Sequence, residues 1–518
     1  MLKGLLFFST SDMKFNTSLS REENFAHACG LALDIIREHM VSSTAQTLVK
    51  KKKSFIAFFG FFFKSDFTYW CIAVIAKYLP IPKRKRIFFS EGWGSFELVE
   101  RIRASLVEPV ASGRGFSSND ARKTLVEWDP FGEVSQTEFE EEEQEQEQGG
   151  GGGGGKKILC ETGIFRIKEV EELCKKSRNL SALQSGQIQK LWRSSSSRRM
   201  DDTKVKRVAI VLPFTGDTKF EFRRRVAKQI LMAKCNNTHN IKDEETVVLI
   251  PEFAFYGNRK AVGQTNHILS NVSEYILMHL IGLREACGLI EWARDTYGDG
   301  VSIAIGGSSM GGYIATGAGI LASRAFHRDD DTNTKKKSSN RANKKLGVVS
   351  VCSWHNFEKS FAPNSYLYLR LDREKVLIKD SYVENMISEI LISSESEGST
   401  SSSLPIGRSI FQNLNWKAVL NRAMQLLVGI DCLMKAGGGA QNFENKLDTM
   451  VNHFSKRDRL ITSDYDEIEA IKSRCTSFTK PRGVVFTYDP GDHLSNVLNP
   501  KAAIVPAFLE AFKRMESS

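Results

Sequence analysis

The sequence has no closely spaced cysteine pair, which argues against domains stabilised by a structural zinc ion and against domains stabilised by a set of disulfides. Its nine cysteines are widely separated, and no two of them form a C-x-x-C motif. This spacing argues against a structural zinc site and against a disulfide framework. Reduced thiols fit the cytosol or an organelle matrix better than secretion. The nine positions are Cys29, Cys71, Cys160, Cys174, Cys235, Cys287, Cys352, Cys432 and Cys475.

The chain also lacks an uninterrupted apolar run of the ~20 residues that a membrane-spanning helix needs. The nearest approach is segment 51–86, which holds two apolar runs, Phe55–Phe63 and Phe67–Leu79. Lys64 and Asp66 separate the runs, and a charge near the middle of a spanning helix costs roughly 2.5–3.5 kcal/mol. Basic clusters flank the segment on both sides and would attract anionic headgroups. We therefore expect it to associate with a membrane surface rather than to cross it. A poor transmembrane helix and a buried N-terminal helix are the alternatives.

No internal repeat, no G-K-[ST] phosphate loop and no module of interleaved basic and aromatic residues is present. The 72 Lys and Arg residues exceed the 61 Asp and Glu residues and give a net charge of +11, which favours an anionic partner. Without a nucleic-acid module we expect that partner to be a membrane surface or a phospholipid rather than nucleic acid. The 33 Phe residues suggest that some of them face lipid or an acyl chain. We expect no metal and no cofactor.

The 518 residues are 41% hydrophobic, which is enough for a sizeable core, but low-complexity stretches interrupt it. The N-terminus, 1–50, is expected to be weakly ordered, and its acidic residues are not typical of a transit peptide. The Glu/Gln-rich and Gly-rich stretch 134–157 is expected to be a disordered insertion. The remaining expected units are the membrane-associating segment 51–86, the first part of a globular domain at 87–133, its core at 158–355, a cap with a Ser-rich loop at 356–447, and a C-terminal part at 448–518.

Short apolar runs alternate with helical patterns from residue 208 onward. This alternation predicts an α/β fold with a mostly parallel sheet and helices on both faces. The expected strands are Val208–Pro213, Thr246–Pro251, Val301–Ile305, Val348–Ser353 and Val484–Tyr488. The expected helices are Phe220–Cys235, Ser270–Thr296, Met310–Ser323 and Pro506–Met515.

A glycine-rich turn joins the third of these strands to the following helix. The segment from Gly307 to Gly311 matches G-x-S-x-G, in which the serine occupies a strained strand-to-helix turn. Side chains two positions before or after that serine would collide with the chain, so both positions need glycine. Ser309 fits this frame, whereas Ser308 does not, because Met310 would occupy its second glycine position. The pattern therefore predicts Ser309 as a nucleophile. The alternatives are a packing turn and a phosphate loop, and the latter would need G-K-[ST].

A serine nucleophile needs a base, and the base needs a carboxylate that orients it. When such a turn lies in an α/β sheet, the chain order is serine, acid, histidine, and the histidine follows the last strand. His493 lies in this position, and His453 is its rival because it is close to the expected acid loop. Asp458 is the favoured acid, 493 − 458 = 35 residues before the histidine, which leaves room for one helix and one strand. Asp464 and Asp466 are the competing acids.

Acyl transfer through a serine also needs backbone N–H groups that stabilise an oxyanion. Met310 begins the helix after the nucleophile, so its N–H and the helix dipole are suitably placed. A second N–H is expected from the loop after the first strand. In that loop Gly216 lets the backbone approach a substrate, and we expect Thr215 to supply the N–H. The alternative is an ordinary turn.

Together these segments resemble the α/β-hydrolase-domain-containing protein 18 family. The resemblance covers most of residues 67–515 and rests on the shared order of its pieces. One departure is Pro213-Phe214, which stands where the family usually has a small Ala-Gly pair. The matching pieces are Gly92-Trp93-Gly94, Thr215-Gly216-Asp217, Arg223-Arg224-Arg225, Tyr256-Gly257-Asn258-Arg259-Lys260, Ser309-Met310-Gly311-Gly312, Ser353-Trp354, Asn415-Trp416, Lys456–Ile461 and Gly491-Asp492-His493-Leu494-Ser495.

The resemblance implies an α/β-hydrolase fold with a serine triad, mitochondrial placement, and deacylation of phospholipid, with cardiolipin the substrate associated with the animal members. A serine ester hydrolase at a mitochondrial membrane is therefore expected, with the cytoplasm or another organelle membrane as alternatives. A catalytically inactive membrane-associated scaffold and an esterase of a small soluble ester are the functional alternatives. Arg223, Arg259 and Lys260 follow early strands and are expected to bind a phosphate headgroup. The alternative for them is a solvated helix face with a structural ion pair.

Overall fold

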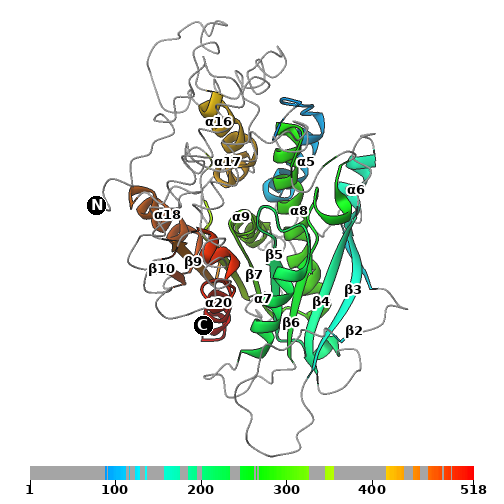
Figure 1. Ribbon diagram of the computed structural model, residues 1–518, viewed down its shortest axis with the longest axis vertical. Coiled ribbons are helices and arrows are strands. Elements are labelled where there is room, and N and C mark those ends of the chain that lie inside the picture. The colour runs from blue at the N-terminus through cyan, green and yellow to red at the C-terminus, as the bar shows by residue number, and fades with distance from the viewer. Residues whose placement is uncertain are drawn as a thin grey trace, which may run out of the picture.

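The computed structural model describes seven stretches of the chain, with short gaps inside them. These stretches are 88–128, 135–136, 157–194, 201–325, 345–357, 416–455 and 465–517. The described strands form a single twisted sheet (Figure 1). In spatial order they are β1 (Thr124–Trp128), β3 (Lys157–Ile167), β4 (Gly186–Ser194), β6 (Thr246–Pro251), β5 (Arg207–Leu212), β7 (Ser302–Ser308), β8 (Lys345–Val351), β9 (Thr449–Ser455) and β10 (Val484–Asp489), while β2 (Ser135–Gln136) pairs with β3.

The sheet is antiparallel at one side and parallel over the rest. β1, β3, β4 and β6 pair antiparallel in succession, whereas the pairs from β6 and β5 through to β10 are parallel. Every residue of β5, β6, β7 and β9 is buried. Strands covered on both faces are expected to read as continuous runs of buried residues rather than as alternating ones. The predicted mostly parallel sheet with helices on both faces is confirmed.

Helices cover the two faces of the sheet and enclose a separate apolar core on each (Figure 1). α8 and α9 lie on one face, and α7 and α20 lie on the other. α8 begins with a capping box in which the side chains of Asn271 and Glu274 satisfy each other's backbone N–H groups. The described α-helices are α5 (Glu97–Ser112), α6 (Lys168–Lys175), α7 (Glu221–Met232), α8 (Val272–Tyr297), α9 (Met310–Ala325), α16 (Trp416–Val428), α17 (Ile430–Ala436), α18 (Tyr465–Phe478), α19 (His493–Leu498) and α20 (Ile504–Ser517), with 3-10 turns η5 (Asp202–Lys204) and η7 (Gly257–Arg259).

The strands and helices expected from the sequence all occur close to their predicted bounds. Two features of the sheet were not predicted. The strands β1, β3 and β4 extend it on the antiparallel side. The strand before the expected acid loop, β9, is fully buried although it contains Asn452, His453 and Ser455. A complete β9 places the start of the acid loop at the carboxyl edge of the sheet, where the predicted site also lies.

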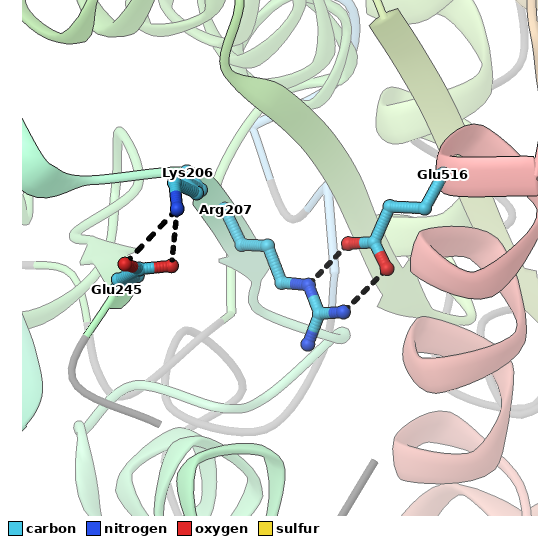
Figure 2. Close-up of polar contacts among 4 residues, drawn as sticks. All are labelled: Lys206, Arg207, Glu245 and Glu516. Atoms are coloured by element: carbon cyan, nitrogen blue, oxygen red, sulfur yellow. Dashed lines mark hydrogen bonds and ion pairs between the residues drawn. The ribbon is translucent and has the colours of Figure 1, made fainter. Parts of the chain in front are cut away.

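A buried ion pair fixes the C-terminal helix α20 to the amino end of β5. Arg207, the first residue of β5, donates from Nε and from Nη2 to the two carboxylate oxygens of Glu516. Figure 2 shows the guanidinium and the carboxylate facing each other, beside a second pair in which Lys206 contacts Glu245 at 2.9 Å. Two parallel N–H···O contacts set both distance and orientation. The pair therefore fixes the position of α20 across β7, β8 and β9.

Several predicted units lie outside the described residues: the N-terminus 1–50, all of segment 51–86, and most of the insertion 134–157. Within the predicted cap 356–447, the structure describes α16 and α17, the gold helices at the top of Figure 1. Among the helices that the structure does describe, none combines the length and the apolar character needed to cross a bilayer. The membrane-associating segment and the domain boundaries stay predictions.

Candidate active site

Ser309 occupies the turn between β7 and α9 in a left-handed backbone conformation. Its φ is +53°, which an L-residue with a side chain rarely adopts. Its N–H donates to the carbonyl of Val351 at 2.7 Å, and its own carbonyl accepts from the N–H of Tyr313 at 3.1 Å. The turn is therefore held on one side by β8 and on the other by the first turn of α9. This is the backbone geometry that G-x-S-x-G predicts for a nucleophile.

The two glycines of the motif are required by close backbone contacts. A Cβ on Gly307 would lie 2.8 Å from the carbonyl carbon of Gly311. A Cβ on Gly311 would lie 2.7 Å from the carbonyl oxygen of Pro213 and 2.9 Å from that of Leu212. The second contact joins the nucleophile turn to the loop after β5, which was expected to complete the oxyanion hole.

Gly311→Ala is expected to reduce turnover by ~100–1,000-fold, the usual cost of losing one oxyanion donor. The new methyl group collides with two backbone carbonyls, so the loop after β5 must move away from the turn. The measurement is the kcat of the purified variant on a chromogenic ester, with thermal unfolding recorded in parallel.

Gly300→Ala is the matched control because a Cβ there meets nothing within 4 Å. Its stability should stay within about 0.5 kcal/mol of wild type, and its kcat should be unchanged. Full activity in a folded Gly311→Ala variant would show that the contact between turn and loop has no catalytic importance.

The loop after β5 provides a backbone N–H without a partner beside the nucleophile turn. Gly216 has a φ of +93°, and its N–H donates to the hydroxyl of Tyr256 at 3.0 Å. The tyrosine is fully buried, and burial raises its pKa, so the hydroxyl stays neutral and able to accept this bond. Within the part of the chain that the structure describes, the N–H groups of Thr215 and Met310 make no hydrogen bond. Both are therefore available to an oxyanion, and their role as oxyanion donors stays a prediction.

The bulky pair Pro213-Phe214 fits this loop without displacing it. The ring of Phe214 packs edge-on against Phe222 of α7, with centroids 5.2 Å apart. The carbonyl of Phe214 accepts the N–H of Asp217 at 3.0 Å and closes the turn. The aromatic side chain is thus accommodated by the helix on that face of the sheet.

Arg223 has a structural role rather than the expected headgroup-binding role. Its side chain is 3% exposed, and its Nε pairs with Asp217 at 2.9 Å. The remaining guanidinium nitrogens donate to the carbonyls of Pro251 and Lys219. Burial raises the pKa of Asp217, and the Arg223 guanidinium opposes that rise. Each of the three guanidinium nitrogens of Arg223 donates within the protein, so this buried residue does not present its charge to a substrate.

Arg259 is likewise committed inside the fold. Its guanidinium is bidentate to Glu285 of α8, at 2.6 and 3.0 Å, and the arginine is 1% exposed. The expectation that it binds phosphate is therefore wrong for the same physical reason. Lys260 is half-buried, and no ion pair of its ammonium is present among the described residues. Of the three basic residues predicted to bind a headgroup, Lys260 is the one that keeps this possibility.

His493 begins α19 and is 4% exposed. It follows β10, so it lies at the carboxyl edge of the parallel strands, the edge at which Ser309 follows β7. α19 is held to that edge through Asn496, which donates to Ser455 at the end of β9 at 2.5 Å. The structure therefore brings the predicted base to the same edge as the predicted nucleophile.

The rival histidine, His453, belongs to β9 itself. Its Nδ1 lies 2.8 Å from the hydroxyl of Thr487 on β10. Burial lowers its pKa, and the carboxylate of Asp489 opposes this effect. A histidine within a strand, paired to the neighbouring strand, is less able to move a proton than one at the start of a helix at the carboxyl edge of the sheet.

The acid of the predicted triad is not among the described side chains. Asp458 and Asp464 lie outside the described residues, and Asp466 belongs to α18 with a side chain that is not described. These three assignments stay predictions. Asp489, the last residue of β10, was not weighed as an acid; its carboxylate accepts the N–H of Gly491 at 2.6 Å and acts electrostatically on His453.

Aromatic side chains surround the helix that follows the nucleophile. The ring of Tyr313 stacks on Trp354 at 5.6 Å and meets Phe357 edge-on at 4.7 Å. The Tyr313 hydroxyl donates to the carbonyl of Val428 at the end of α16, at 2.8 Å. Burial lowers the pKa of the neighbouring His279 to about 4, so this histidine is neutral at physiological pH. The described part of the cap is thus fixed directly to α9 in uncharged surroundings.

Comparisons with known proteins find one family model and several similar solved structures. Residues 187–401 match the model of the family described as alpha/beta hydrolase domain containing 18. No curated protein matches the chain. Three similar solved structures are an acetyl xylan esterase from Thermoanaerobacterium sp. (11% identity, 84% of this chain and 99% of that chain covered, TM-score 0.35), a peroxisomal α/β-hydrolase from Saccharomyces cerevisiae (12%, 64% and 81%, TM-score 0.32) and a thermostable esterase from Pseudomonas putida (12%, 64% and 77%, TM-score 0.31).

At such low identity and TM-score these structures carry no argument about a substrate. The strand order and the turn at Ser309 are instead properties of this chain. Together with the family match they confirm the predicted fold: this protein has the α/β-hydrolase fold, and its residues 187–401 match the model of the α/β-hydrolase-domain-containing 18 family.

Proposed function

We propose that this protein is a serine ester hydrolase in which Ser309 is the nucleophile. The observation that carries the proposal is the positive φ of this serine at the N-terminus of α9. A non-glycine residue in such a conformation costs of order 1–3 kcal/mol. A fold kept only as a scaffold has no need to retain that strain, so this observation favours an enzyme over the inactive alternative.

The reaction proceeds through an acyl-enzyme. The Ser309 hydroxyl attacks the ester carbonyl while His493 accepts its proton, and the N–H groups of Met310 and Thr215 stabilise the oxyanion. The tetrahedral intermediate collapses, and His493 passes the proton to the leaving alcohol. Water then attacks the acyl-serine with His493 again as base, which releases the acid and restores the serine. Asp458 orients the imidazole.

A phospholipid is the substrate that we propose, with cardiolipin the specific candidate. The family resemblance supports it, as do the abundance of Phe and the basic clusters that flank residues 55–79. Because Arg223 and Arg259 form buried ion pairs, we propose that Lys260 and the basic clusters contact the phosphate headgroup. The corresponding location is a mitochondrial membrane surface.

The test is a comparison of vesicles. Cardiolipin vesicles are compared with phosphatidylglycerol vesicles of equal charge density and with a short-chain soluble ester, and release of fatty acid is measured. The expected result is Ser309-dependent release that is fastest from cardiolipin. Equal rates from both vesicles would show that charge, not headgroup structure, selects the substrate. Hydrolysis of the soluble ester alone would replace the phospholipid with a small ester. If folded wild-type protein hydrolyses none of the three substrates, the catalytically inactive scaffold is the function that remains.

A further inference from the structure

Three buried polar side chains connect α19 to the turn that carries Ser309. Asn496 is 2% exposed, and its Nδ2 donates to the Oγ of Ser455 at 2.5 Å. Ser455 is 1% exposed, and its Oγ lies 2.9 Å from the Sγ of Cys352. These residues come from α19, from the end of β9 and from the residue after β8. The contacts therefore join the carboxyl ends of two strands to the short helix that begins with His493.

The contacts continue to the nucleophile through the backbone. Cys352 has a φ of +48°, and its N–H donates to the carbonyl of His453 at 2.8 Å. The preceding residue, Val351, accepts the N–H of Ser309 at 2.7 Å. Cys352 thus adopts a strained conformation beside the strained serine. Such strain persists only where the surrounding structure fixes it, and it gathers at functional sites.

Asn496 lies three residues after His493 in the same helix, so the two side chains project from neighbouring turns. α19 spans six residues, too few for a helix to be stable by itself, so its position is set by what it packs against. Val497 packs in the apolar core, but apolar packing is not directional and does not by itself fix the rotation of a helix. The amide of Asn496 adds a directional contact that fixes its rotation, and with it the direction in which the imidazole points.

Resting on the proposed function, we infer that Asn496 is a positioning residue for catalysis, which acts through Ser455 to hold His493 in reach of Ser309. A displacement of about 1 Å can reduce a rate ~100-fold, so loss of this contact should lower kcat far more than it lowers substrate binding. An Asn with a merely structural role would lower stability and leave kcat of the folded protein unchanged.

Asn496→Ala is compared with Val497→Ala, which removes apolar packing from the same helix. We expect the Asn variant to lose ~10–100-fold in kcat with KM within about twofold, and the Val variant to keep kcat while losing thermal stability. Ser455→Ala should resemble Asn496→Ala, and the double variant should be no worse than the poorer single one, because the two side chains act as one unit. Unchanged kcat in folded Asn496→Ala, or an equal loss in Val497→Ala, overturns the inference.

Two further measurements keep the outcome clear. Asn496→Leu preserves the volume of the side chain, so it tests the same contact if the Ala variant does not fold, and the same loss of kcat is expected. The ring resonances of His493, identified among the nine histidines with His493→Ala, should shift in Asn496→Leu and not in Val497→Ala. This readout needs no turnover, so an inactive wild type defeats the proposed function without deciding the positioning role. Unshifted His493 resonances defeat the positioning role alone.

Discussion

Ser309→Ala should abolish ester hydrolysis, with a fall in kcat of about 10⁴-fold or more, while the protein stays folded. Loss of the nucleophile leaves only the oxyanion donors and the binding surface, which retain a small residual rate. The fold should be kept because the serine side chain contributes nothing essential to the turn: its backbone contacts to Val351 and Tyr313 remain. The measurements are kcat on a chromogenic ester and the thermal unfolding midpoint.

The positive φ makes a second variant informative. Ser309→Gly should be as inactive as the Ala variant yet at least as stable, because glycine adopts a φ of +53° without strain. Ser308→Ala is the control, since Ser308 is the buried last residue of β7 and occupies a variable position of the motif rather than its serine position. If Ser309→Ala keeps its activity and Ser308→Ala loses it, Ser308 rather than Ser309 is the nucleophile.

Arg259→Ala should destabilise the protein by about 3–5 kcal/mol, the cost of leaving one partner of a buried ion pair alone. The remaining carboxylate of Glu285 is buried, and burial raises its pKa. Lys260→Ala, one residue further on at a half-buried position, should change stability by less than about 1 kcal/mol. Chemical denaturation of both variants measures the difference.

A compensating variant separates lost pairing from lost packing. Arg259→Met combined with Glu285→Leu removes both charges, so it should recover much of the stability that Arg259→Ala loses. If instead Arg259→Ala is as stable as Lys260→Ala and raises KM for anionic lipid, the arginine binds substrate after all, and its ion pair is incidental.

Local patterns in the sequence were enough to predict the central sheet and the nucleophile turn. β5, β6 and β7 are continuous apolar runs, and the glycines around Ser309 are dictated by backbone contacts within a few residues. The antiparallel strands could not be predicted in this way. In β4, the buried Lys190 pairs with Glu161 of the neighbouring strand at 3.2 Å and with Asp202 at 3.6 Å.

The errors in the site have the same origin. The charge of Arg259 is neutralised by Glu285, which is 26 residues away, and a pairing of this kind leaves no local pattern. The polar residue His453 of β9 can be buried because its Nδ1 lies 2.8 Å from the hydroxyl of Thr487 on the neighbouring strand. Basic residues near an active site indicate substrate binding only when they form no ion pair with an acidic residue of the protein.

Mass spectrometry of the wild-type protein after reaction with a fluorophosphonate locates the nucleophile without any variant. Our account predicts a single adduct, on the peptide that contains Ser309, which does not form when the protein is unfolded before the reagent is added. An adduct on a different residue of the folded protein, with the Ser309 peptide unmodified, would contradict it.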